Sequence, residues 1–265
     1  MGKWRPTRLD CLYVIPDIHG MYDQLNLILK RILPLRKSDG GKDMLVFLGD
    51  YIDRREDSHK VVDLLIKLKK EYPDQIKMLR GNHEQMLLDA IKPSMTSHNY
   101  LFWMQNGGEN SLLGYVRRAK QEVDNPYIIE RIRVRDYIPL KHIEFFESLP
   151  YYFEFEDYIF VHAGCDPTKL LFNQDKNALL FDRSLYSIVR DRLNKVPLPW
   201  EKVVVTGHNG GKEYNILIRD KYMMLDMSHK SNLLVLELRS MTGFVAKKGK
   251  KRLVSVRIGY GQGNK

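Results

Sequence analysis

Five apolar runs in this sequence each end in a cluster of side chains that could bind a metal ion or a phosphate. The clusters combine carboxylate, imidazole, amide and guanidinium groups: Asp17-Ile18-His19-Gly20, Gly49-Asp50-Tyr51-Ile52-Asp53-Arg54, Arg80-Gly81-Asn82-His83-Glu84, Val161-His162-Ala163-Gly164 and Thr206-Gly207-His208-Asn209. Burying such polar groups without partners costs about 1–3 kcal/mol each, so they must be hydrogen-bonded, solvated or bound to a ligand. We interpret the set as one site.

The types of side chain in these clusters favour a two-metal site. Oxygen and nitrogen ligands without thiolates suit manganese, iron or zinc, whereas calcium and magnesium rarely take three histidines. The spacing Asp17-x-His19 puts both side chains on the same side of an extended loop, and Asp50 is placed to bridge a second ion. Two metals roughly 3.5–4 Å apart can clamp a phosphoryl group and acidify a shared water. The clusters therefore predict phosphoester hydrolysis.

An alternation of strands and helices positions the first three clusters. Strand-like runs and helical stripes follow one another at residues 9–15, 22–33, 44–48, 58–70 and 76–79. This β-α-β-α-β order predicts a parallel sheet with right-handed crossovers, in which ligands bind at the carboxyl ends of the strands. The polar clusters follow the predicted strands at those ends.

From residue 85 to about residue 150 the pattern is helical, and it predicts a helical cap insertion. The expected helices span residues 85–91, 100–104, 109–119, 128–132 and 140–149. Tyr100, Phe102 and Trp103 could contact a substrate there, but aromatic residues at helical spacing are more often part of a core. We therefore favour a core role for them.

Short strands return after residue 150 and predict a second sheet packed on the first. They are expected at residues 151–155, 158–162, 203–206, 216–218, 223–225 and 233–238. The chain is thus predicted to be one α/β domain over residues 1–265, with two packed mixed β-sheets flanked by helices. The cap would occupy about residues 85–150, and a basic tail about residues 247–265.

The positive charge of the chain is concentrated in that tail. The formal net charge is +10, and seven positive residues with no acid among them follow from residue 247: Lys247, Lys248, Lys250, Lys251, Arg252, Arg257 and Lys265. The tail could be a solvated terminus around a last strand at residues 252–260, or a patch for acidic substrates or RNA. We favour the solvated terminus, because charge runs are common and unspecific, and we do not expect a nucleic-acid partner.

Cysteine content and hydropathy indicate a compartment. The only two cysteines, Cys11 and Cys165, give no disulfide framework, so a reducing environment fits. We expect no signal peptide, and no run approaches the roughly 20 apolar residues that a membrane-spanning helix needs. The sequence predicts a cytoplasmic protein without a membrane partner.

The five clusters, in this order, resemble the successive motifs of the phosphoprotein phosphatase branch of the metallophosphoesterases. The likeness is closer to bacterial and phage members of the lambda-phage type, because Arg80-Gly81-Asn82-His83-Glu84-Gln85-Met86 and Asn106-Gly107-Gly108 have near-matching counterparts there. The resemblance covers about residues 9–238. It implies a calcineurin-like sandwich of two sheets and a two-metal phosphatase.

The resemblance also implies a role for each motif residue. The first metal would be held by Asp17, His19 and Asp50, and the second by the bridging Asp50 with Asn82, His162 and His208. His83 would protonate the leaving oxygen while Asp53 holds its ring. Substrate phosphate would be bound by Arg54, Asn82 and Arg183, the last of which lacks the tryptophan-containing segment that usually precedes it. Two divalent ions are expected as cofactors, manganese first, with iron, zinc or nickel as alternatives.

Three departures from the family pattern lie where the mouth of the site is expected. Arg55 stands in place of a glycine, either adding charge to the rim or pointing to solvent. Asn209-Gly210 replaces a threonine-proline pair, and Asp226-Met227-Ser228 stands where aspartate-threonine-glycine is common. These departures leave substrate preference open.

The resemblance implies a phosphomonoesterase acting on phosphoserine or phosphothreonine, with phosphotyrosine or a small phosphoester as further substrates. Attack would come from water shared by the two metals. A dinucleoside polyphosphate hydrolase is the enzyme alternative. Asp53 and Glu84 argue against it, because the symmetrical hydrolases generally lack the first residue and carry aspartate at the second position. A non-catalytic metal-binding or nucleic-acid-binding module is the remote alternative, since decayed enzymes usually lose ligands and this chain keeps all six.

Overall fold

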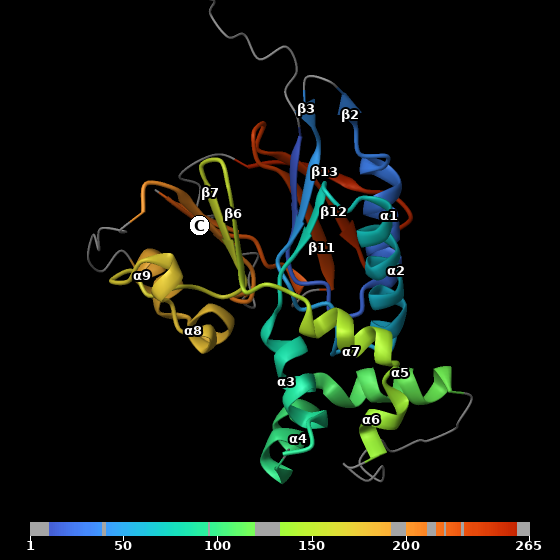
Figure 1. Cartoon of the computed structure of the whole chain (residues 1–265). Helices are drawn as coiled ribbons and strands as arrows, with labels where there is room; N and C mark the ends of the chain where they lie inside the picture. Colours follow the sequence, from blue (N-terminus) through green and yellow to red (C-terminus); the bar gives the residue numbers. More distant parts are fainter. Residues whose placement is uncertain are drawn as a thin grey trace, which may run out of the picture.

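In the computed structural model, two β-sheets pack against each other between two layers of helices (Figure 1). The structure describes residues 11–38, 41–94, 96–119, 133–191, 200–210, 216–219, 221–228 and 231–258. Helices α1 (Tyr22–Ile32) and α2 (Ser58–Glu71) cover one outer face, and α8 (Lys176–Phe181) and α9 (Ser184–Asp191) lie against the other. The predicted α/β class with two packed, helix-flanked sheets is confirmed.

The first sheet has six strands in the order β13-β12-β11-β1-β4-β5. Their bounds are β1 (Leu12–Ile15), β4 (Met44–Phe47), β5 (Ile76–Met78), β11 (Asn232–Glu237), β12 (Thr242–Lys247) and β13 (Val254–Arg257). Strands β1, β4 and β5 are parallel, as the β-α-β-α-β order predicts, whereas β11, β12 and β13 pair antiparallel.

The second sheet has five strands in the order β6-β7-β8-β10-β9. Their bounds are β6 (Tyr152–Phe155), β7 (Tyr158–Val161), β8 (Val203–Thr206), β9 (Leu217–Arg219) and β10 (Tyr222–Met224). The three central strands are parallel, and both edge strands pair antiparallel. A hairpin of β2 (Lys37–Ser38) and β3 (Gly41–Lys42) stands apart from both sheets.

The structure corrects one strand assignment and adds elements. The strand expected at residues 233–238 was placed in the second sheet, but β11 joins the first sheet beside β1. It is buried along its whole length, which suits a strand that is covered on both faces. Helices α8 and α9 and strand β12 were not predicted, because periodicity in segments this short does not distinguish helix from strand.

Apolar side chains on both faces of the strands explain the layering. In β1, Leu12 and Val14 enter the core between the sheets, while Ile15 packs with the helices of the outer layer. In β4, Val46 enters the core between the sheets and Phe47 packs with the helices of the outer layer. Each fully buried side chain of this kind contributes roughly 1.5–3 kcal/mol, so the central strands are fixed by burial on both sides.

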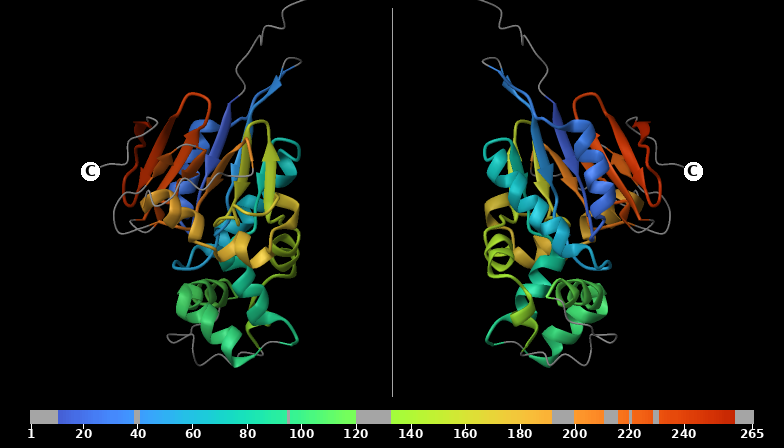
Figure 2. Two further views of the ribbon diagram at one scale, coloured as in Figure 1. Left: turned by 90° about the vertical axis from the view of Figure 1, so that its left-hand side faces the viewer. Right: turned by 90° about the vertical axis from the view of Figure 1, so that its right-hand side faces the viewer.

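A helical segment lies below the carboxyl ends of the strands (Figure 2). It comprises α3 (Asn82–Ile91), α4 (Ser97–Trp103), the π-helical turn η1 (Met104–Gly108), α5 (Glu109–Arg118), α6 (Val134–Tyr137) and α7 (Leu140–Glu147). The helix expected at residues 128–132 lies outside the described residues. Among those that are described, no helix has both the length and the apolar composition needed to cross a bilayer.

Candidate metal centre

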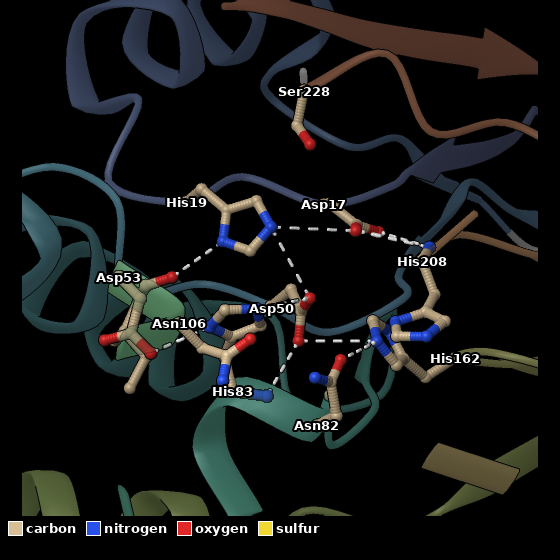
Figure 3. A network of polar contacts seen from close by, with 12 residues as sticks. Asp17, His19, Asp50, Asp53, Asn82, His83, Asn106, His162, His208 and Ser228 are labelled. Atoms are coloured by element: carbon tan, nitrogen blue, oxygen red, sulfur yellow. Dashed lines mark hydrogen bonds and ion pairs between the residues drawn. The ribbon is translucent and has the colours of Figure 1, made fainter. Parts of the chain in front are cut away.

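The five polar clusters meet at the carboxyl ends of β1, β4, β5, β7 and β8. These strands run in the same direction within their sheets, so the loops that follow them share one edge of the sandwich. Figure 3 shows the side chains of the six predicted metal ligands gathered around Asp50, and they are Asp17, His19, Asp50, Asn82, His162 and His208.

Asp50 lies at the centre of this cluster. Its Oδ2 is 3.5 Å from His19 Nε2, and its Oδ1 is 3.3 Å from His162 Nε2. Two groups of possible ligand atoms, each within 4.8 Å of one another, share Asp50: one adds His19 and His83, and the other adds His162 and His208. One carboxylate facing two groups of imidazoles is the geometry that a bridging ligand needs.

Asp17 and Asn82 add an oxygen atom on either side of Asp50. Asp17 Oδ2 is 3.8 Å from His19 Nε2, and Asn82 Oδ1 is 2.9 Å from His162 Nε2. Burial and the nearby carboxylates of Asp226 and Asp50 raise the pKa of Asp17 well above its usual value. Such crowding of buried carboxylates is relieved by a bound cation.

The unpaired atoms of the cluster fit a cation. His19 Nε2 and Asp50 Oδ2 are buried without a hydrogen-bond partner among the described residues. His19 Nδ1 lies 2.8 Å from the carbonyl of Ile52, and His162 Nδ1 lies 2.9 Å from the carbonyl of Leu48. Each Nδ1–H therefore donates to the backbone, which leaves Nε2 as the ring nitrogen that faces the cluster, as in metal-binding histidines.

The backbone at the cluster adopts unusual conformations. Five of the eight described non-glycine residues with positive φ belong to these loops, with φ between 43° and 72°: His19, Asp50, Asp53, Arg54 and His208. Such conformations cost of order 1–3 kcal/mol and persist only where the surroundings enforce them, which is common at functional sites. The loops therefore hold their side chains under strain at this edge.

Glu84 supplies part of that enforcement. Its buried carboxylate accepts backbone N–H groups at 2.8–3.3 Å from Asp50, Tyr51, Ile52 and Gly81. The sequence analysis used Glu84 only to compare enzyme classes and missed this role. A single acidic residue at the third position of α3 thus fixes the loop that carries the central carboxylate.

His83 and Asp53 form a buried pair next to the cluster. His83 Nδ1 lies 2.8 Å from Asp53 Oδ2, and His83 Nε2 lies 3.8 Å from Asp50 Oδ2. Burial alone would lower the pKa of His83, but the carboxylates of Asp50 and Asp53 outweigh it and raise that pKa. Trp103 also donates its indole N–H to Asp53, and the sequence analysis missed this contact because it treated Trp103 only as core.

Two arginines lie at the rim. Arg54 is exposed, and its backbone N–H donates to the carbonyl of Gly107 at 3.0 Å, which joins the loop after β4 to η1. Arg183 is exposed just before α9. Burial first, and then the charges of His162 and Arg183, lower the pKa of His208 to about 2. Both predicted phosphate-binding arginines are thus exposed, one on the loop that follows β4 and one on the segment before α9.

The departures from the family pattern lie against the same loops. Arg55 Nη1 donates to the carbonyl of His19 at 2.8 Å, and Arg55 Nη2 donates to Ser231 Oγ at 2.7 Å. Of the two alternatives stated for Arg55, the one in which it simply points to solvent is excluded. Asp226 accepts the backbone N–H groups of Gly210 and Ser228 at 2.9 and 2.7 Å, which ties two of the departing segments together.

Comparison with known proteins decides the family. The family described as calcineurin-like phosphoesterase matches residues 12–227, which include every cluster of the site. The chain belongs to the calcineurin-like phosphoesterases. This membership confirms the predicted metallophosphoesterase family and implies a centre of two divalent metal ions.

Individual relatives of this calcineurin-like phosphoesterase extend the comparison. The chain is 37% identical over 98 residues to serine/threonine-protein phosphatase 1 of Salmonella typhimurium, and this match covers 37% of the chain and 39% of the relative. The match thus spans well under half of that protein's length.

Solved structures share the fold. A crystal structure of a putative diadenosine tetraphosphatase matches with a TM-score of 0.53 at 18% identity. The match covers 95% of this chain and 95% of that one. A protein serine/threonine phosphatase from Saccharomyces cerevisiae also has a TM-score of 0.53, at 17% identity, over 97% of this chain and 82% of that one. At these identities the likeness concerns the fold alone.

Proposed function

We propose that this calcineurin-like phosphoesterase hydrolyses phosphate monoesters of serine and threonine in proteins, with two manganese ions as cofactor. The observation that carries the proposal is the buried His83–Asp53 pair, which lies next to Asp50, the residue that the two groups of possible ligand atoms share. A proton donor beside a two-metal cluster is suited to cleavage of an ester whose leaving group is a strongly basic alkoxide, because such a group must be protonated as it departs.

In this proposal the ligands divide into two sets that share Asp50. One set is Asp17, His19 and Asp50, and the other is Asp50, Asn82, His162 and His208. When bound, two divalent ions would polarise the phosphoryl oxygens and make water a nucleophile at neutral pH. The proposed division accounts for the buried, unpaired His19 Nε2 and Asp50 Oδ2.

The remaining residues act on the substrate itself. His83 donates its Nε2 proton to the leaving oxygen, while Asp53 accepts the hydrogen bond from Nδ1 and keeps the ring oriented. Arg54 and Arg183 bind phosphate oxygens from the rim, because a guanidinium can donate two parallel hydrogen bonds to a phosphate. Asn82 contributes its amide at the same place.

The name of the Salmonella relative supports the choice of a phosphoprotein substrate. The shared fold with a putative diadenosine tetraphosphatase makes diadenosine tetraphosphate the competing substrate to be tested. One experiment separates them: the protein is stripped with a chelator, manganese is restored, and a phosphothreonine peptide and diadenosine tetraphosphate are offered together. Preferential phosphate release from the peptide is expected, whereas preferential cleavage of the nucleotide would overturn the substrate class.

A further inference from the structure

A strongly basic hairpin joins β12 to β13. We call residues 247–252 the basic hairpin, and its charged residues are Lys247, Lys248, Lys250, Lys251 and Arg252. All of these residues are exposed, and none of them forms an ion pair with another described residue. Five positive charges within six residues therefore face solvent without an ion-pair partner among the described residues.

Strand pairing places the basic hairpin at the edge of the sandwich that carries the metal cluster. Lys247 pairs with Asn232 at the start of β11, and β11 runs antiparallel to β1. The residue before Asn232 is Ser231, whose Oγ accepts from Arg55, and Arg55 also donates to the carbonyl of the predicted ligand His19. The hairpin is thus connected to the metal-binding loop through one strand pair and one guanidinium.

The distance between the basic hairpin and the loop that follows β1 would allow one extended substrate peptide to contact both. Two strand spacings of about 4.8 Å separate β12 from β1, so the hairpin begins roughly 10 Å to the side of the loop that follows β1. An extended peptide advances about 3.3 Å per residue. Side chains about three to six positions from a phosphorylated residue would therefore reach the hairpin.

We propose that the basic hairpin binds acidic residues that flank the phosphorylated residue of a protein substrate and so makes the enzyme prefer acidic phosphopeptides. This inference rests on the proposed function. Lysine ammonium groups on flexible stems attract carboxylates without demanding a fixed geometry, which suits substrates of varied sequence. Residues 247–252 contain no aromatic side chain on which a nucleobase could stack, so they favour an acidic peptide over single-stranded nucleic acid.

The test compares two double variants of the full chain. The hairpin variant carries Lys250→Ser and Lys251→Ser. The control variant carries Lys67→Ser and Lys70→Ser. These changes remove two exposed lysines from the C-terminal half of α2, which runs away from the edge of the sheet that carries the metal cluster. The substrates are a phosphothreonine peptide flanked by glutamates, the same peptide with glutamines, and p-nitrophenyl phosphate.

We expect the unmodified enzyme to prefer the glutamate peptide at low salt. The hairpin variant should raise KM for that peptide roughly three- to tenfold with kcat unchanged, as expected for the loss of two solvent-exposed charge contacts. In the hairpin variant, KM and kcat for the glutamine peptide and for p-nitrophenyl phosphate should equal those of the unmodified enzyme. The control variant should have the kinetic constants of the unmodified enzyme for all three substrates. The preference should shrink as ionic strength rises, because exposed charges are screened.

Equal kcat/KM for the two peptides in the unmodified enzyme, or an equal loss for both peptides in the hairpin variant, would overturn the inference while leaving the proposed function intact. Inhibition by single-stranded RNA that exceeds inhibition by an unphosphorylated acidic peptide, and that disappears in the hairpin variant, would assign the hairpin to nucleic acid instead. Turnover of p-nitrophenyl phosphate without turnover of either peptide would overturn the proposed function and this inference together.

Discussion

Trp103 donates its indole N–H to both carboxylate oxygens of Asp53, at 3.2 and 3.1 Å. The indole is fully buried, and Asp53 Oδ2 also accepts from His83 Nδ1 at 2.8 Å. Asp53 is therefore held from two directions, by a side chain of α4 and by a side chain of α3. The helical segment below the sheets thus contributes directly to the orientation of the proposed general acid.

Replacing the indole tests this contribution. Trp103→Phe keeps most of the aromatic bulk but removes the N–H donor, so Asp53 loses a hydrogen bond to a charged group, worth about 1.5–3 kcal/mol. We expect kcat for a phosphothreonine peptide to fall by about tenfold or more, with little change in KM. Trp200→Phe, which alters a half-buried tryptophan in another hydrophobic cluster, is the control. An unchanged kcat in the first variant would contradict the proposed role of Trp103.

The role of His83 predicts a dependence on the leaving group. His83→Asn removes the proton donor, and general acid catalysis of this kind contributes roughly 10²- to 10⁴-fold. We expect kcat for a phosphothreonine peptide to fall by that factor. The loss should be much smaller with p-nitrophenyl phosphate, because its leaving anion is stable without a proton. Equal losses on the two substrates would remove His83 from the role of acid and indicate a contribution to metal binding instead.

A second network, buried at His142 and Tyr115 and partly exposed at Asp63, predicts how stability depends on pH. His142 Nε2 lies 3.1 Å from Asp63 Oδ1, and Tyr115 Oη lies 2.9 Å from His142 Nδ1. The three residues connect α2, α5 and α7. Burial lowers the pKa of His142 from 6.5 to about 4, although Asp63 partly opposes this effect. The folded protein therefore binds fewer protons at His142 than the unfolded chain does between these two pH values.

The sign of the effect follows from that difference. The stability that neutral His142 provides is fully present above pH 6.5 and is lost as the pH falls towards 4. Between pH 7 and pH 5 the free energy of unfolding should fall by about 2 kcal/mol more in the unmodified protein than in His142→Gln. Urea unfolding at both pH values measures this double difference. An equal fall in the free energy of unfolding in the two proteins would contradict the assignment of this pH dependence to His142.

The elements that carry the site could be predicted because each is encoded locally. Apolar runs that end in a carboxylate or a histidine are visible in the sequence, and the β-α-β-α-β order states that the first three runs end at one edge. Burial on both faces of β1 and β4 follows from their continuous apolar sequence. The family resemblance then links the clusters in the second sheet to those in the first.

The contacts that orient the site could not be predicted, because they join residues far apart in the chain. Trp103 and Asp53 are 50 positions apart, and Arg55 and Ser231 are 176 positions apart. Helical spacing accounts for the burial of Trp103 equally well with or without a polar partner. The placement of β11 beside β1 is likewise a matter of tertiary pairing, which the pattern of a six-residue apolar strand does not specify.

Metal content of two matched variants tests the central claim most directly. Asp50 and Asp53 are both buried carboxylates, three positions apart, but only Asp50 faces both groups of ligand atoms. After chelator treatment, equilibration with manganese and removal of free metal, we expect two ions per chain in the unmodified protein and in Asp53→Asn. Asp50→Asn should retain at most one. Two ions retained by Asp50→Asn, or at most one bound by the unmodified protein, would contradict a centre of two metals bridged by Asp50.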